Sequence, residues 1–441
     1  MMGFKVSGLG WSGIALGLVL AAPGVAAAQG SAAAPTFTKD IAPIFQEKCE
    51  ACHRPDSIGP MSLQTYEEAR PWVRSIKARV AERQMPPWHL DKGVGIQKFK
   101  NDRSLSDDQI ATIVKWADAG APRGDAKDLP PKKVWPDGQG WNFAAMFGQK
   151  EPDMVITSHE FTMPARSQDA WDKRQTPTGI TEPRWVRAIE IRPTTLKGRR
   201  ITHHAIAYLR QEENDPAANF NMLAPFMEWA VGKEGEMMRP NTGKLLLPGS
   251  VINWDIHYSA AGEEITNAVE LGVYFYPKGQ EPKYRNYLAL VPAAIGEMDI
   301  QPNTISVAQG NTVLRQAARI ESFQAHMHLR GKAMLMEAIL PTGQQQVLSY
   351  VNDFNFNWHN TYVYADDAAP LLPKGTILKI TAWHDNTSAK KSNPDPNQWV
   401  GWGDRTVDEM AHAWVNIVYM SDEDMAAEVQ ARKTGTRTQQ Q

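Results

Sequence analysis

Residues 201–209 have the sequence Ile-Thr-His-His-Ala-Ile-Ala-Tyr-Leu, a short run of β-branched, aromatic and small apolar residues. Runs of this kind are typical of β-strands. Similar runs recur later, separated by Pro, Gly and Asn turns, at 185–191, 269–276, 323–327 and 377–383. Closely spaced strands favour antiparallel sandwiches over alternating strands and helices. Because this region is longer than one ordinary sandwich, we expect two all-β sandwich domains, at 141–290 and 291–425, and a polar, frayed tail at 426–441.

The chain before these strands has a helical pattern instead. Apolar side chains follow helical spacing at Ile41, Ile44 and Phe45, and a second apolar stripe runs from Tyr66 to Val80. Apolar residues at this spacing place one face of each helix against a common core. The pattern therefore predicts at least two packed helices near the N-terminus.

A third helix is marked at both of its ends. Ser106 is a typical N-cap with Gln109 three residues later, which is the capping-box pattern, and Gly120 ends the helix. We therefore expect a small all-α domain at 36–120. The Pro-, Gly- and Lys-rich residues 121–140 are predicted to be a linker.

Composition restricts the class of protein. The 441 residues include 47 Lys and Arg against 49 Asp and Glu, so no broad basic face for nucleic acid is indicated. With 42% hydrophobic and 22% charged residues, the chain has the composition of a folded globular protein.

The first 28 residues resemble a secretory signal peptide. Lys5 is their one charge, 13–22 form a short apolar stretch, and three alanines ending at Ala28 offer a cleavage site. The apolar stretch is too short for a transmembrane helix, although an uncleaved anchor is the alternative. We expect an exported, periplasmic protein that has no stable membrane insertion after cleavage near Ala28.

The two cysteines of the chain lie in one motif, Cys49-Glu50-Ala51-Cys52-His53. The CxxCH pattern attaches haem covalently: Cys49 and Cys52 bind the vinyl groups and His53 binds the iron. A CxxC redox pair or half a zinc site is the rival interpretation. For the second axial ligand we favour Met85, in the sequence Gln-Met-Pro-Pro-Trp, over Met61 and His89, which stay open. A Met/His-ligated haem is typical of an electron carrier.

The remaining histidines are grouped. His203 and His204 are adjacent, His257 lies in a second β-like run, and His326 and His328 are separated by one residue. Alternating residues of a strand share a face, so the last pair forms a natural chelate. Any one histidine alone is more often a structural residue. Together they favour a metal site, with zinc and copper both open from spacing.

Several segments resemble the copper type II monooxygenases, the family of peptidylglycine α-hydroxylating monooxygenase and dopamine β-monooxygenase. The resemblance runs from about residue 150 to 422 and is carried by ITHHAIAYL (201–209), VINWDIHY (251–258), HMHLRGK (326–332) and TVDEM (406–410). The N-terminal part is similar to the cytochrome c domain fused to some bacterial members.

The resemblance implies two jelly-roll sandwiches, each contributing one copper site across a solvent cleft. His203, His204 and His257 would form the electron-transfer site. The site where oxygen binds and substrate is attacked would consist of His326, His328 and Met410. Because neighbouring strand residues point to opposite faces, His203 and His204 can share a metal only if a bulge redirects one of them, and we predict that irregularity.

The resemblance is incomplete around the substrate. No cysteines remain for the disulfides of the animal members. Where the peptide-amidating enzyme has an Arg for the substrate carboxylate, this chain has Gln324, and the positions two and four residues after Met410 are His412 and Trp414. These three residues are candidates for contact with substrate or with the metal ligands. The change favours a neutral or aromatic substrate.

The expected function is that of an exported copper monooxygenase, which hydroxylates a C–H bond of a small organic substrate with O₂. Its cofactors would be two copper ions and one covalent haem c. The reaction consumes two electrons, so the attached haem would relay electrons from a periplasmic donor. The alternative is a non-catalytic haem and copper electron-transfer or copper-binding protein. A zinc hydrolase is disfavoured, because 323–332 lack a carboxylate to activate water.

Overall fold

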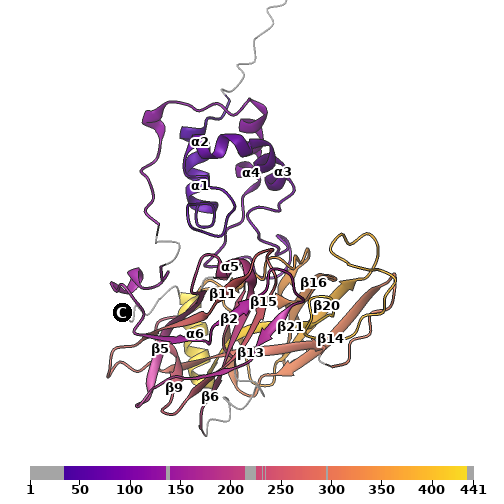
Figure 1. The fold of residues 1–441 in the computed structure, drawn as a ribbon. Coiled ribbons are helices and arrows are strands. Elements are labelled where there is room, and N and C mark those ends of the chain that lie inside the picture. Colours follow the sequence, from indigo (N-terminus) through magenta and orange to yellow (C-terminus); the bar gives the residue numbers. More distant parts are fainter. Residues whose placement is uncertain are drawn as a thin grey trace, which may run out of the picture. The chain divides into compact units, whose positions relative to one another are not determined.

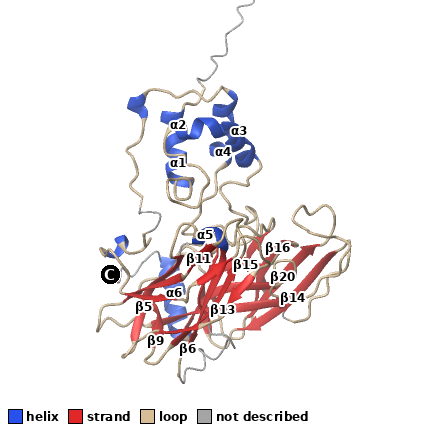
Figure 2. Ribbon diagram, in the orientation of Figure 1, coloured by secondary structure: helices blue, strands red, loops and turns tan. Residues whose placement is uncertain are grey.

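The computed structural model describes residues 34–135, 140–213, 225–230, 232–233, 235–294 and 296–434. The predicted signal peptide, 1–28, lies outside these residues. Contacts group Pro35–Gln441 into one compact unit. Within it, helices occupy the N-terminal part and strands most of the rest (Figures 1 and 2). No helix among the described residues is both long and apolar enough to cross a membrane.

The N-terminal part has no assigned strand in its described residues before Met154. Its helices pack around one apolar core, in which Phe37 and Phe45 surround the fully buried Trp116. The helices are η1 (Phe37–Ile41), α1 (Ala42–Lys48), α2 (Tyr66–Ala69), η2 (Arg70–Trp72), α3 (Val73–Ala81) and α4 (Asp107–Asp118). The helical stripes predicted from the sequence are therefore confirmed.

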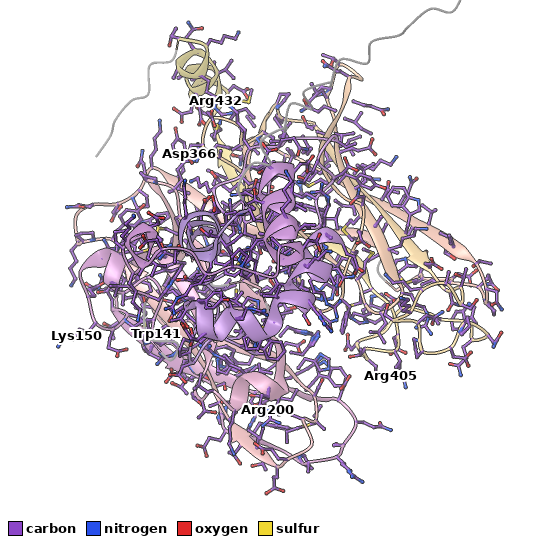
Figure 3. All side chains as sticks on the ribbon, turned by 90° about the horizontal axis from the view of Figure 1, so that it is seen from above. Trp141, Lys150, Arg200, Asp366, Arg405 and Arg432 are labelled. Carbon is purple, nitrogen blue, oxygen red and sulfur yellow. The ribbon has the colours of Figure 1, made fainter. Side chains whose placement is uncertain are left out.

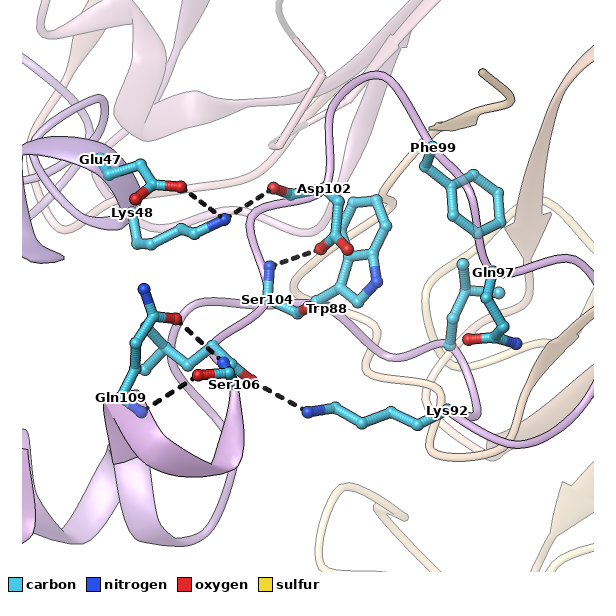
Figure 4. Close-up of a pocket in the computed structure, with 12 residues that line it drawn as sticks. Glu47, Lys48, Trp88, Lys92, Gln97, Phe99, Asp102, Ser104, Ser106 and Gln109 are labelled. Atoms are coloured by element: carbon cyan, nitrogen blue, oxygen red, sulfur yellow. Dashed lines mark hydrogen bonds and ion pairs between the residues drawn. The ribbon is translucent and has the colours of Figure 1, made fainter. Parts of the chain in front are cut away.

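The predicted start of α4 is also confirmed. Ser106 accepts a hydrogen bond from the Gln109 N–H at 3.1 Å, and the Gln109 side chain accepts one from the Ser106 N–H at 2.9 Å. This capping box satisfies two amide groups that the helix leaves unpaired. It lies beside a cavity of about 460 Å³ that Lys48, Trp88 and Asp102 also line (Figure 4).

One segment departs from the predicted α-domain at 36–120. Between α3 and α4 the chain leaves the helical core and packs on the last sandwich, where Leu90 pairs with Val351 and Phe99 with Tyr364. Leu90 is a member of that sandwich's apolar core. The helical part is therefore discontinuous in sequence, because the apolar residues of this segment are buried against strands rather than helices.

The predicted linker, 121–140, is shorter than expected. The Phe37 and Thr38 N–H groups donate to the carbonyls of Pro122 and Arg123, both at 2.9 Å. Further on, the Trp135 indole N–H donates to Glu50 at 2.9 Å. The described part of this segment thus packs back on the helices, and 136–139 lie outside the described residues.

The strands form two sandwiches, one in each half of this region, and one sheet runs through both of them. The strands of the first half are β1 (Met154–Thr157), β2 (Phe161–Met163), β3 (Ala170–Asp172), β4 (Gln175–Pro177), β5 (Arg184–Pro193), β6 (Thr202–Arg210), β7 (Pro225–Ala230), β8 (Glu236–Met237), β9 (Thr242–Leu246), β10 (Val251–Tyr258), β11 (Ile265–Asn267) and β12 (Val269–Phe275). Those of the second half are β13 (Tyr284–Ala294), β14 (Ile305–Val313), β15 (Ala317–His326), β16 (Gly331–Ile339), β17 (Gln345–Val351), β18 (Tyr362–Val363), β19 (Leu371–Leu372), β20 (Ile377–Asp385) and β21 (Ala411–Met420).

In the first half, the strands β1-β12-β5-β9 pack against the sheet β3-β10-β6-β7 around one apolar core. In the second half, β13-β21-β15-β18 pack against β14-β20-β16-β17 around another. Every strand run predicted from the sequence is present. The two halves share one continuous sheet, because β9 pairs in parallel with β13.

Two predicted boundaries are corrected. A division at residue 290 would cut β13, which pairs with β21 over most of its length and with β9 at its start. The tail predicted from Ala426 instead continues the helix α6 (Asp422–Thr434). Glu428 on this helix binds Arg319 at 2.6 Å and Arg239 at 3.2 Å, and Met425 packs against an apolar cluster of the sandwich, so charge pairing and apolar contact together hold the helix. Residues 435–441 lie outside the described part of the chain.

Candidate metal centre

The predicted irregularity at His203 is present. Along the β6–β10 ladder His204 pairs with His257, but the next pair joins Thr202 to Tyr258. His203 is therefore an extra residue in β6, opposite no residue of β10. Such a bulge turns a side chain away from its alternating position. As a result His203 and His204 lie side by side, with their Nδ1 atoms 3.3 Å apart.

The bulge brings three imidazoles together. One nitrogen each of His203, His204 and His257 lies within 4.8 Å of the others. Their ring centroids are 5.6 Å (His203–His204), 5.2 Å (His203–His257) and 5.0 Å (His204–His257) apart. Two imidazoles bound to one tetrahedral metal at the usual ~2.0 Å have centroids about 5 Å apart. The cluster therefore has the dimensions of a three-histidine metal site.

Two residues that the sequence analysis missed hold His257 in place. Asp169 Oδ2 lies 3.2 Å from His257 Nε2, and the Thr406 and Ser259 hydroxyls also donate to the Asp169 carboxylate. Trp171 stacks on the His257 ring at 4.7 Å. A carboxylate behind a ligand histidine is a common device for fixing its orientation. No sequence signal connects Asp169 with a histidine 88 positions later.

The second histidine pair lies at the end of β15. His326 is the last residue of that strand, and the His328 ring is 5.5 Å from it. The His328 Nδ1–H donates to the Asp408 carbonyl at 3.1 Å, which leaves Nε2 as the nitrogen with a lone pair. Met410 follows two residues after Asp408, immediately before β21.

Glu409 ties these two segments together. Its buried carboxylate accepts the backbone N–H groups of His328 at 2.9 Å and Arg330 at 2.5 Å. Burial raises the pKa of Glu409 to about 7. Nearby, the His384 Nε2–H donates to the Met410 carbonyl at 3.1 Å. Glu409 and His384 thus position the loop that carries Met410.

Two more histidines contact His326. His412 is its direct cross-strand neighbour on β21, and their rings stack at 4.4 Å. His359 lies 4.9 Å from His326 and 6.1 Å from His203. Since the His204 ring is only 6.2 Å from that of His326, the two clusters form one continuous histidine array, made up of His203, His204, His257, His326, His328, His359 and His412. The expected solvent cleft between two separate sites is not the arrangement in this structure.

Burial keeps the array neutral. It lowers the pKa of His203 and of His328 to about 4, and that of His412 to about 3, with neighbouring histidines adding to the effect. The pKa values of His204 and His326 are also lowered by burial. A neutral imidazole is the form that binds a metal ion.

Unsatisfied nitrogen atoms are a second indication that the array fits metal ions. Within the described part of the chain, His257 Nδ1, His326 Nδ1 and His412 Nε2 are buried without a hydrogen-bond partner. An unpaired buried polar atom costs about 1–3 kcal/mol, which coordination to a metal would offset.

The other predicted substrate residues are buried. Gln324 is fully enclosed, donates to Glu228 at 2.8 Å across the two sandwiches, and accepts a hydrogen bond from Thr361. Trp414 packs between the sandwiches against Ile206. Both residues join the two halves in this structure.

The CxxCH motif follows α1 directly. Cys49 and Cys52 are both half-buried and not joined in a disulfide, and burial raises the pKa of Cys49 to about 12. The His53 Nδ1–H donates to the Met61 carbonyl at 3.3 Å, so that Nε2 carries the lone pair for a metal. This is the orientation that an axial haem ligand needs.

The candidates for the second axial ligand lie in different surroundings. The hydrogen bond from His53 Nδ1–H to the Met61 carbonyl holds the Met61 backbone on the same side of the motif as His53. Met85 follows α3 and is half-buried beside a cavity of about 450 Å³. His89 is buried on the last sandwich, where its backbone N–H donates to the Tyr362 hydroxyl at 3.3 Å.

Comparisons with known proteins do not assign the chain to a family. No protein-family model matches it, and no curated protein matches it. Solved structures with some likeness include the infectious bursal disease virus VP2 subviral particle (11% identity, covering 60% of this chain and 70% of that one, TM-score 0.18). Another is recombinant pro-11S globulin of pumpkin (6% identity, 61% and 85% coverage, TM-score 0.13). TM-scores this low support no inference about fold or function.

Proposed function

We propose that this protein is an exported copper-dependent monooxygenase that receives electrons through its own c-type haem. The observation that carries the proposal is the buried histidine array, in which the bulge at His203 completes a three-histidine cluster beside His326 and His328. The substrate class is a small organic molecule with an oxidisable C–H bond. Export follows from the signal-like residues 1–28, which lie outside the described part of the chain.

The donor set favours copper over zinc. Imidazole suits both metals, but a thioether such as that of Met410 is a soft ligand that favours Cu(I). His203, His204 and His257 would hold one ion, and His326, His328 and Met410 the other. Copper bound there would supply the one-electron redox chemistry that the use of O₂ requires. The protein's own contribution is to keep the imidazoles neutral, oriented and away from water.

The CxxCH motif is proposed to hold the haem. Cys49 and Cys52 would form the thioethers, His53 Nε2 would be one axial ligand and Met85 the other. The hydrogen bond from His53 to the Met61 carbonyl supports this choice, since it places Met61 on the same side of the motif as His53. A haem with these ligands supplies single electrons at a potential suited to transfer.

A short connection between the two centres supports the electron relay. The buried Asn360 side-chain amide donates to the Pro87 carbonyl at 2.9 Å, two residues after Met85. Asn360 directly follows His359, whose ring adjoins both His203 and His326. One hydrogen bond and the covalent bonds of two short chain segments, from Met85 to Pro87 and from Asn360 to His359, therefore link the proposed haem ligand to the histidine array.

One observation favours the alternative of a non-catalytic haem and copper protein. His257, His326 and His328 are less than 10% exposed, and Gln324 and Trp414 are buried as well. An electron-transfer or copper-binding protein needs no substrate space. Oxygen consumption separates the two functions, because a carrier cycles between redox states without net use of O₂.

Anaerobic titration with Cu(I) against a competing chelator tests the proposal. Haem-loaded, full-length protein should bind two copper ions, and His203→Ala or His257→Ala should each lose one. His159→Ala, at an exposed position outside the array, should keep both. X-ray absorption at the copper edge should detect one sulfur ligand of copper in the wild type and none in Met410→Leu. Equal copper binding by the wild type and the His203 and His257 variants would exclude the proposed site.

A further inference from the structure

A second candidate site is lined by residues other than those of the histidine array. A cavity of about 620 Å³ lies between the CxxCH segment and the first sandwich, and Cys52 is part of its wall. Its volume is within the range of small-molecule pockets. Arg200, which also lines the cavity, is labelled in Figure 3.

The wall of this cavity is strongly cationic. Six basic side chains line it against two carboxyls, Asp56 and Glu190, and the basic residues are Arg54, Arg103, Arg192, Arg199, Arg200 and Lys233. The Glu190 carboxylate already accepts the N–H groups of Asn142 and Phe143 and the Tyr274 hydroxyl. These hydrogen bonds fix its position, and Glu190 and Asp56 together can offset no more than two of the six basic charges of the wall.

Some of these cations are fixed by partners outside the cavity. Arg192 pairs with Glu270 at 2.9 Å and lies over the Trp141 ring, while Arg200 pairs with Glu263 at 3.0 Å. Lys233 is buried beside Glu236 at 2.8 Å. These contacts hold the side chains in place around the cavity, which reduces the entropy lost when a ligand binds.

Arg199 is partly buried and lies near two other guanidinium groups of the wall. Its pKa is lowered by burial and then by the nearby guanidinium groups of Arg54 and Arg192. Like charges held close together in a partly buried wall repel one another, and an anion between them would remove that repulsion. Apolar side chains make up another part of the wall, among them Ile58, Ile191, Leu196 and Trp229.

We propose that this cavity binds a carboxylate-bearing ligand with an apolar body, its carboxylate held by Arg199 and Arg54 and its body against Ile191 and Trp229. The carboxylate has two sources: a free organic acid, or the propionate groups of a haem attached at Cys49 and Cys52. The first source is independent of the copper proposal, and the second rests on the haem of the proposed function.

Calorimetric titration of the haem-loaded, full-length protein at constant ionic strength tests this site. Benzoate should bind with one equivalent, whereas neutral benzamide should not. Arg199→Gln and Arg54→Gln should each weaken benzoate binding by about tenfold to a hundredfold, the loss of a charge-assisted hydrogen bond. The control is Arg210→Gln, an exposed arginine on β6 that does not line the cavity, which should bind as the wild type does.

A Cys49→Ala/Cys52→Ala variant without haem separates the two sources. If free acids use the cavity, benzoate binds with and without haem. If haem propionates fill it, benzoate binds only to the haem-free variant, and Arg199→Gln shifts the haem midpoint potential of the loaded protein. Failure of benzoate to bind either form, or unchanged binding by both arginine variants, would overturn the proposal whatever the copper content.

Discussion

Buried histidines make the metal-free protein sensitive to acid. Burial lowers the pKa of His203, His328 and His384 to about 4, whereas an unfolded histidine has a pKa near 6.5. Below pH 6.5 these histidines therefore bind protons in the unfolded chain but stay neutral in the folded chain. The contribution of the neutral histidines to the free energy of unfolding is complete above the pKa of the unfolded histidines. It is lost as the pH falls toward the pKa values of the folded histidines.

We accordingly predict that the free energy of unfolding falls between pH 7 and pH 5. Each histidine that takes up a proton on unfolding contributes a slope of about 1.4 kcal/mol per pH unit. Urea unfolding of the metal-free protein at several pH values measures it, with exposed His159→Ala as a variant that leaves the slope unchanged. Equal stability at pH 7 and pH 5 would be incompatible with a neutral, buried array.

Gln324 joins the two sandwiches through its hydrogen bonds with Glu228 and Thr361. Gln324→Leu leaves the buried Glu228 carboxylate without this donor, so we predict a loss of about 1–3 kcal/mol in the free energy of unfolding. Copper content should stay that of the wild type, because Gln324 is not one of the proposed ligands. Gln345→Leu, at an exposed position on β17, should change stability by no more than about 0.5 kcal/mol. A fully stable Gln324→Leu protein would exclude this structural role.

At the scale of elements, the capping box of α4 gives a measurable contribution. Ser106→Ala removes the side-chain acceptor of the Gln109 N–H and should lower the free energy of unfolding by about 1 kcal/mol. Ser104→Ala is the matched control, since the Ser104 contact with Asp102 is made by its backbone N–H. Chemical unfolding compares the two variants, and equal effects would show that the cap does not stabilise the helix.

Regular elements could be predicted because local patterns determine them. The strand runs at 201–209 and 377–383 and the signals at both ends of α4 all correspond to observed elements. The bulge at His203 could be predicted because two adjacent residues cannot face the same side of a regular strand. Most of the proposed ligands were found the same way, from paired histidines in β-like runs together with a family resemblance.

Features that depend on distant contacts could not be predicted. The residues around Leu90 look like a loop between helices, and only the last sandwich gives them a core to join. Helix α6 has no buried residue, and its ion pairs are with Arg319 and Arg239, far away in the sequence. Likewise Asp169 reaches the histidine array from a loop, where neither periodicity nor spacing marks a ligand environment.

At the scale of the whole molecule, the electron relay depends on the contact between Pro87 and Asn360. Asn360→Ala removes this hydrogen bond, and we predict several-fold slower oxidation of the reduced haem in copper-loaded protein mixed with O₂. Copper content and the haem spectrum should be unchanged. Asn101→Ala is the control, because Asn101 makes a similar bond to the Thr361 carbonyl at 2.7 Å but has no connection to Met85 through Pro87. Equal rates in both variants would place the electron path elsewhere.

The central claim is that a buried histidine array binds copper and passes electrons from the attached haem to O₂. The most direct test is to load the full-length protein with copper, reduce it anaerobically, and mix it rapidly with O₂ while haem oxidation and O₂ consumption are followed. We expect two copper ions per haem and haem oxidation that depends on copper. A haem that reoxidises at the same rate with and without copper, or a protein that binds no copper, would contradict it.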